Sequence, residues 1–178
     1  MMARLATIIV VLLMSINAYA LPDSYKKTLQ QNMEIIKSSK TAYVWGGVGG
    51  IKDGVIGLDC SGLIYYLYRQ SGIPVKRSTA FRMRHGLDGW IGNDVALDDV
   101  EAHDIPFWTW KGQEAKRPFG HVGLFYEGSQ SKLLETMHSS SSKNGVVVQQ
   151  LRGSLLRDLK AIRRITIGDK KQNGNGKK

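Results

Sequence analysis

Apolar residues recur at every third or fourth position through much of the first half of the chain, which is the spacing of a helix with one buried face. This spacing predicts a helix over residues 23–40 that is capped by Asp23 or Ser24. It also predicts a second helix over residues 60–72 and a short third helix over residues 78–86.

The second half of the chain shows short apolar runs separated by Gly, Ser, Lys and Asn, which is the pattern of strands joined by turns. Helices followed by strands predict an α+β fold in which the N-terminal helices pack on an antiparallel β-sheet. The glycines of residues 46–50 predict a flexible loop through which backbone approaches a substrate, since no phosphate-binding motif surrounds them. The predicted strands are Ile105–Trp110, His121–Tyr126, Lys132–His138, Gly145–Leu151 and Ala161–Ile167.

The first 20 residues have the organisation of a secretory signal peptide. Arg4 provides a positive start, Leu5–Met14 form an apolar block, and Ala18-Tyr19-Ala20 has the small residues of a cleavage site. The block is too short for a stable membrane anchor, which needs about 20 apolar residues; an uncleaved anchor is the alternative. We therefore expect an exported, periplasmic or extracellular protein whose mature chain begins near Leu21.

A single domain over residues 21–167 is expected from the chain length, and residues 168–178 are expected to form a disordered basic tail. The formal net charge is +10, and +9 without the signal region. This balance favours a polyanionic partner such as an acidic cell wall. Nucleic acid is not expected, because no basic stripe with interleaved aromatic residues is present. A charge that only keeps the protein soluble is the alternative.

Cys60 is the only cysteine, so it cannot form a disulfide within the chain. In an exported protein such a thiol either links two chains or reacts. At the first turn of a helix, unpaired backbone N–H groups and the helix dipole favour the thiolate and can stabilise an oxyanion, and Gly62 leaves one side of this turn open. The alternative is a small buried residue that happens to be cysteine.

A nucleophilic cysteine needs a base, and the chain offers four histidines. His121 begins one predicted strand and His138 ends the next, so we expect them side by side, with one acting as base and the other orienting it. His85 and His103 lie in polar, loop-like contexts and are expected at the surface. Neither a metal nor a cofactor is expected, since no zinc-binding motif is present.

Four segments resemble the NlpC/P60 family of cysteine peptidases, which cut peptidoglycan stem peptides. They are YVWGG (Tyr43–Gly47), LDCSGLIYYLYRQSGIPVKRSTA (Leu58–Ala80), GHVGLFYEG (Gly120–Gly128) and ETMHSSSSKNGVVVQQL (Glu135–Leu151). Their order and intervals fit the family. The resemblance implies a papain-like α+β fold and hydrolysis of an amide in the stem, most often the γ-D-glutamyl–diamino-acid bond.

The resemblance also implies roles for individual residues. Cys60 matches the nucleophile, His121 the general base, and His138 the polar residue that orients the base. Tyr43 matches an aromatic residue that lines the cleft. Asp59 and Ser61 match two residues that bind the free amino end of the stem in several members, and Arg77 matches a basic residue beside the cleft. Core packing, a helix cap and a solvated charge are the respective alternatives for Tyr43, Asp59 and Arg77.

The segment before the His121 strand departs from the family pattern. Asp104 and Phe107 match it, but Pro-Gly is missing and Phe107–Phe119 forms a longer loop with extra tryptophans and basic residues. We expect this loop to affect substrate choice rather than the catalytic pair. Two alternatives stay open: an amidase or acyltransferase on the same Cys–His fold, and a non-catalytic wall-binding module or a dimer linked through Cys60. We expect a monomer whose partners are peptidoglycan stem peptides.

Overall fold

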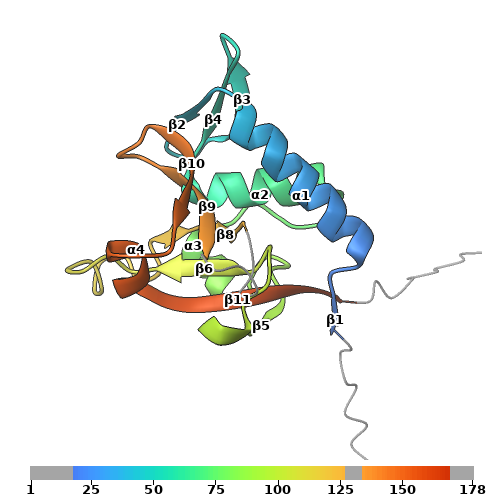
Figure 1. Cartoon of the computed structure of the whole chain (residues 1–178), viewed down its shortest axis with the longest axis vertical. Helices are drawn as coiled ribbons and strands as arrows, with labels where there is room; N and C mark the ends of the chain where they lie inside the picture. Colours follow the sequence, from blue (N-terminus) through green and yellow to red (C-terminus); the bar gives the residue numbers. More distant parts are fainter. Residues whose placement is uncertain (1–17, 127–133, 169–178) are drawn as a thin grey trace, which may run out of the picture.

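Helices α1 (Asp23–Ser38) and α2 (Cys60–Gln70) pack against each other through the apolar faces that the sequence predicts. The computed structural model describes residues 18–126 and 134–168. Figure 1 shows α1 as the long blue helix along one side of the molecule, with α2 beside it. The buried apolar side chains of the two helices are Leu29, Met33, Ile36, Leu63, Ile64, Leu67 and Tyr68.

The start of α1 differs from the prediction. No side chain caps this helix, so the expected cap by Asp23 or Ser24 is wrong. Pro22 is the N-cap residue instead, and its carbonyl accepts two backbone N–H bonds of the first turn. Its pyrrolidine ring already fixes φ near the helical value. The short helix α3 (Ala80–Arg84) lies within the predicted range 78–86, and the Thr79 side chain caps it.

Among the described residues, the strands form three sheets. The first and second are antiparallel, and the third combines one parallel and one antiparallel pair. The first follows the order β1 (Ala18–Ala20), β11 (Leu159–Gly168), β6 (Ile105–Trp108), β7 (His121–Val122), with β5 (Gly92–Asp94) also paired to β11. The second has the order β10 (Gly145–Gln150), β9 (Glu135–Ser140), β8 (Leu124–Phe125), and the third β2 (Thr41–Tyr43), β4 (Val55–Leu58), β3 (Val48–Lys52).

The predicted strand 121–126 lies where expected but is divided at Gly123. Its first half, β7, pairs with β6, and its second half, β8, pairs with β9. A Cβ atom at Gly123 would lie 2.8 Å from the carbonyl oxygen of Met137, so only glycine lets the chain pass at this point. The segment thereby joins the first and second sheets and carries His121 between them.

The third sheet was not predicted, and residues 46–50 are not simply a flexible loop. Val48–Lys52 pair with β4, with a register shift between Val48 and Gly50. Gly49 has φ +100°, and a Cβ atom there would lie 2.2 Å from the ring of Tyr66. This glycine therefore serves a bulge and a close approach to α2.

A smaller apolar cluster lies on the other side of β6, next to the short helix α4 (Ser154–Arg157) and the 3-10 turn Leu97–Asp99. The members of this cluster come from segments that are distant in sequence, so the cluster packs the C-terminal part of the chain against its middle part. They are Val100, Trp108, Phe125, Leu151, Leu155 and Ile162.

Both ends of the chain lie only partly within the described residues. Most of the expected signal peptide (residues 1–17) and nearly all of the expected tail (residues 169–178) fall outside them. Ala18–Ala20 form β1, which pairs with β11, and Leu21 is buried. Within the described ranges, no helix combines the length and apolar character needed to cross a membrane.

Candidate active site

Cys60 is the first residue of α2, and the turn that carries it is held by Asp59. The Asp59 side chain accepts the N–H of Gly62 and so caps the helix, while its second oxygen accepts the N–H of Gly46 at 2.9 Å. The carboxylate therefore ties the first turn of α2 to the loop between β2 and β3. This arrangement fixes Cys60 at the end of the helix, as the sequence predicts.

Gly62 does not leave an open side at this turn. A Cβ atom at this position would lie 1.8 Å from the carbonyl oxygen of Gly47. The same loop also accepts the Asp59 N–H at 3.1 Å, through Gly47. The expectation of open space is therefore wrong: glycine is required because the loop backbone packs directly on the turn that holds Cys60.

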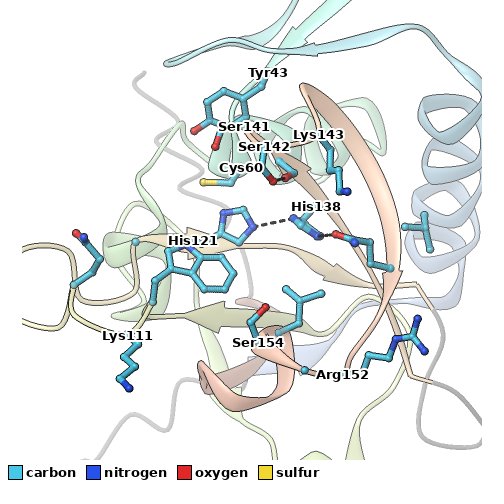
Figure 2. A pocket seen from close by; sticks show the side chains of 18 of the residues that line it. Tyr43, Cys60, Lys111, His121, His138, Ser141, Ser142, Lys143, Arg152 and Ser154 are labelled. Carbon is cyan, nitrogen blue, oxygen red and sulfur yellow. Dashed lines mark hydrogen bonds between the residues drawn. The ribbon is translucent and has the colours of Figure 1, made fainter.

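The two histidines that were expected to lie together do so. His121 in β7 and His138 in β9 have ring centroids 4.9 Å apart, and His121 Nε2 lies 2.9 Å from His138 Nδ1. Figure 2 shows Cys60, His121 and His138 in this order along the floor of a cleft, with the Cys60 sulfur on the side of His121 away from His138. Strands β7 and β9 and the start of α2 thus converge at one place.

Gln149 in β10 extends this row and was not identified from the sequence. Its Oε1 lies 3.0 Å from His138 Nε2. A carbonyl oxygen only accepts, so His138 Nε2 carries a proton and its neutral ring accepts at Nδ1. His121 then donates from Nε2, which leaves its Nδ1 as the unprotonated nitrogen of the ring. The register of β9 and β10 explains this contact: His138 pairs with Val147, so Gln149 is the diagonal neighbour of His138 on the adjacent strand.

The electrostatics of the pair favour neutral groups. Burial raises the pKa of the Cys60 thiol to about 11, and the negative charge of Asp59 acts in the same direction. Hydrogen bonds from the backbone of Val122 and Ser61 oppose this increase but do not outweigh it. Burial lowers the pKa of His121 to about 3, with a further contribution from His138. The prediction that the start of the helix favours the Cys60 thiolate is thus wrong, because the desolvation of the thiol outweighs the effect of the helix end on its pKa.

Two tryptophans near the start of the Phe107–Phe119 segment form one side of the site. The Trp110 ring centroid lies 5.3 Å from that of His121, and the Trp108 centroid lies 5.4 Å from it. Trp108 is fully buried, and its indole N–H donates to the carbonyl of Leu155. Trp110 lines the cleft. Of the two, Trp110 is therefore the one that can contact a substrate.

The cleft above Cys60 and His121 has a volume of about 1200 Å³. Tyr43, expected to line it, does so, together with the exposed Trp45. Burial raises the pKa of Tyr43, and the charge of Arg117 opposes this increase. A space of this size accommodates a peptide segment rather than a single small molecule.

Asp59, Ser61 and Arg77, predicted to bind substrate, do not line this cleft. Arg77 donates to both carboxylate oxygens of Asp59, at 3.0 and 2.8 Å, and to Ser61 Oγ at 2.8 Å. Ser61 in turn donates to Asp59 at 3.0 Å. The three side chains form one network beneath the Cys60 turn, in which Asp59 is also the helix cap. Their predicted contact with the stem peptide stays a prediction.

The remaining histidines lie away from the cleft. His85 is exposed, as expected, and packs on Phe81. His103 is half-buried rather than at the surface, with its Nε2 3.0 Å from Gln30 Oε1. Burial lowers the pKa of His103 to about 4. Within residues 18–126 and 134–168, no three His, Cys, Asp or Glu side chains gather as a metal site would require.

Comparison with known proteins places this arrangement in a family. A gamma-D-glutamyl-L-lysine dipeptidyl-peptidase of Bacillus subtilis (strain 168) is 28% identical over 123 residues, which cover 68% of this chain and 36% of the relative. The chain thus spans about a third of the length of that protein. The sequence model of the NlpC/P60 family matches residues 40–163, which include every residue of the Cys60–His121–His138 row. The chain belongs to the NlpC/P60 family of cysteine peptidases.

Proposed function

We propose that this protein hydrolyses an amide bond in peptidoglycan stem peptides, at the linkage between γ-D-glutamate and the following diamino acid. The observation that carries the proposal is the hydrogen-bonded row of His121, His138 and Gln149, which leaves His121 Nδ1 without a proton in the same peptide-sized cleft as the Cys60 thiol. The name of the Bacillus relative, a peptidase for a γ-D-glutamyl bond, supports this choice of bond.

Acylation begins from the neutral pair. As the Cys60 sulfur attacks the amide carbonyl, its proton moves to His121 Nδ1. The imidazolium that forms is stabilised by donation from Nε2 to His138. The tetrahedral oxyanion lies at the start of α2, where the first N–H groups of the helix have no partner within the helix. His121 then protonates the leaving amine, and a thioester with Cys60 remains.

Deacylation uses the same base. With the amine gone, water enters the cleft, and His121 Nδ1 takes one of its protons while the oxygen attacks the thioester carbonyl. Collapse of the second tetrahedral intermediate breaks the C–S bond, and the proton returns to the sulfur. The free carboxylic acid leaves and the neutral Cys60–His121 pair is restored. The Trp110 ring beside His121 limits the access of water to one side of the imidazole.

We also propose that the protein acts after export, as a monomer, in the periplasm or outside the cell. The support is the signal-like pattern of residues 1–20 and the positive net charge, which suits an anionic wall.

The proposal is tested by mass spectrometry of purified muropeptides incubated with the mature protein. We expect fragments whose masses place the cut after γ-D-glutamate, and a loss of activity of roughly a thousandfold or more in Cys60→Ala and His121→Ala. The matched control is His85→Ala, which removes an exposed imidazole outside the cleft and is expected to leave the rate unchanged.

Other outcomes select other functions. Cys60-dependent products with a different mass would indicate an amidase on the same site, and transfer of an acyl group to an added amine would indicate an acyltransferase. Binding to the wall without cleavage, together with an unreactive thiol, would contradict the peptidase proposal and favour a binding module.

A further inference from the structure

The base of the proposed reaction becomes positively charged during catalysis, yet no acidic side chain is paired with it. Within residues 18–126 and 134–168, no carboxylate forms an ion pair with His121 or His138. His121 Nε2 is bonded to His138, and His138 Nε2 to Gln149, so the partners in this row are neutral. Because His121 is buried, its imidazolium has lost most of its hydration. The stabilisation of this charge therefore has to come from groups other than carboxylates.

Two indole rings lie against this imidazole. The ring centroid of His121 is 5.4 Å from that of Trp108 and 5.3 Å from that of Trp110, with interplanar angles of 44° and 35°. The face of an aromatic ring is partially negative, and it attracts a cation that lies within about 6 Å of the centroid, most strongly when the ring is tryptophan. Both indoles are within this range, so both can stabilise a positive charge on His121.

The two indoles also fix each other in place. Trp108 is fully buried, and its N–H donates to the carbonyl of Leu155. Trp110 is half-buried and lines the cleft, and it stacks on Trp108 with the ring centroids 6.5 Å apart and the planes inclined by 11°. Trp108 is thus the fixed platform that sets the position of Trp110. Because Trp110 borders the cleft, its ring can be replaced without opening a closed cavity in the core.

We propose that Trp108 and Trp110 stabilise the imidazolium that forms on His121 when Cys60 attacks, and that Trp110 is therefore a positioning residue for the reaction. This role rests on the proposed function, because it requires His121 to be the base. It also gives a catalytic purpose to the Phe107–Phe119 segment, which departs from the family pattern and was expected to affect substrate choice rather than the catalytic pair.

The pH decides whether the reaction of the thiol needs this imidazolium. At neutral pH the Cys60 thiol reacts while it passes its proton to His121, so the transition state contains an imidazolium. At alkaline pH the thiol loses its proton to the solvent, and the thiolate reacts while His121 stays neutral. A residue that stabilises the imidazolium therefore accelerates the first route and leaves the second unchanged, whereas a residue that only shapes the cleft affects both.

The test is the alkylation of Cys60 by iodoacetamide, followed by mass spectrometry of the intact protein. The sulfur displaces iodide and forms a C–S bond, and Cys60 is the only thiol of the chain. Rates are measured at neutral pH and at alkaline pH, close to the raised thiol pKa of about 11. In Trp110→Leu we expect the neutral rate to fall about tenfold and the alkaline rate to stay unchanged, whereas Trp110→Phe keeps an aromatic face and should lose no more than about threefold.

The matched control is Phe81→Leu, which removes a ring that packs on His85 with the centroids 4.2 Å apart. Neither residue lines the cleft, so the ratio of the neutral to the alkaline rate should equal that of the wild-type protein. This ratio is taken within each variant, so a wider entrance to the cleft cancels. Partial unfolding would expose the thiol and raise the neutral rate, which is opposite to the expected fall.

The outcomes separate this role from the proposed function. An equal fall at both pH values, an unchanged neutral rate in Trp110→Leu, or equal losses in the Leu and Phe variants would each overturn the role of Trp110. In His121→Ala the neutral rate must fall if His121 is the base. A neutral rate in that variant as high as in the wild-type protein would count against the proposed function itself.

Discussion

At the scale of single residues, burial decides the charge state of Cys60 and His121. Each group loses hydration in its charged form, and the charge that acts most strongly on the thiol, that of Asp59, is negative. The pKa of Cys60 is raised and that of His121 is lowered, so the neutral pair is the resting state. His121 therefore acts as a base during the attack, rather than holding a thiolate before the substrate binds.

This state can be measured directly. A thiolate absorbs in the ultraviolet where a thiol does not, so the difference spectrum between the wild-type protein and Cys60→Ala reports the ionisation of Cys60 alone. We expect no thiolate signal at neutral pH and a rise only at alkaline pH, toward the raised pKa of about 11. A signal already present at pH values below the ordinary thiol pKa of about 8.5 would contradict the neutral pair.

Gln149 is predicted to control which nitrogen of His121 is basic. In Gln149→Met the acceptor for His138 Nε2 is lost, both rings can change tautomer, and we expect kcat to fall by about 10- to 100-fold. In Gln149→Glu the carboxylate raises the pKa of His138. Once protonated, His138 donates from both nitrogens and forces the His121 lone pair onto Nε2. We therefore expect a new loss of activity at acidic pH in this variant.

The control for both variants is Gln70→Met, which changes an exposed glutamine at the end of α2. Circular dichroism and thermal unfolding separate a local effect from a loss of fold. If Gln149→Met lowers activity only in proportion to its loss of folded protein, and Gln149→Glu keeps the wild-type pH profile, Gln149 has only a structural role.

At the scale of secondary structure, the nucleophile depends on how closely α2 approaches the β2–β3 loop. Gly62→Ala places a methyl group where the carbonyl of Gly47 lies, so the loop or the helix must move. We expect the variant to lose roughly 3 kcal/mol or more of unfolding free energy, near the upper end of the cost of overpacking, and to lose activity through displacement of Cys60. Denaturant unfolding and peptidase assays measure the two effects.

The matched control is Gly50→Ala on the neighbouring strand β3, where no atom lies within 4 Å of the added methyl group. This change is expected to shift stability by less than about 0.5 kcal/mol, as surface substitutions generally do. Equal stability of the two alanine variants would show that the loop yields easily and that the close packing at Gly62 is unimportant.

The elements also show why only part of this architecture was predictable. Helix α2 has an aspartate cap and a continuous apolar face, so local chemistry determines it. Strands β2, β3 and β4 are short, and most of their residues are exposed or half-buried, so no alternating pattern marks them. They exist because β4 pairs with both neighbours, which is a tertiary effect.

The same distinction applies to the site. The order of the strands indicated that His121 and His138 are neighbours, but their orientation depends on the register of β9 and β10, which also brings in Gln149. The pairing of Asp59 with Arg77 could not be predicted either, because it depends on a contact between residues that lie 18 positions apart in the sequence. The sequence thus predicted which residues belong to the site, whereas the hydrogen-bond partners of these residues are known only from the folded structure.

At the scale of the whole molecule, buried histidines link stability to pH. His121, His138 and His103 all have lowered pKa values because burial disfavours their charged forms. Above about pH 6.5 they are neutral in both the folded and the unfolded chain and contribute nothing to the pH dependence. Below this pH the unfolded chain binds protons that the folded chain excludes, so the free energy of unfolding decreases as pH falls toward the folded pKa values.

The carboxylates act in a different range. The pKa of Asp158 is lowered by its hydrogen bond and ion pair with Arg157, and that of Asp88 by its contacts with Arg82 and Ser78. Their stabilising effect is present above the unfolded pKa of about 4 and is lost only as pH falls below it. Between about pH 6.5 and pH 5 the change in stability therefore comes mainly from the histidines.

Each such histidine reduces the free energy of unfolding by up to about 1.4 kcal/mol per pH unit in this range. We expect the Tm of the wild-type protein to fall by roughly 10 °C between about pH 6.5 and pH 5.

His103→Gln removes one of the three groups but keeps a donor for Gln30, so its Tm should fall by clearly less over the same range. Because His103 lies outside the cleft, the variant should also remain active. Thermal unfolding followed by circular dichroism measures the two slopes. Parallel slopes, or a wild-type Tm that is constant over this range, would mean that these imidazoles gain protons in the folded protein as readily as in the unfolded chain.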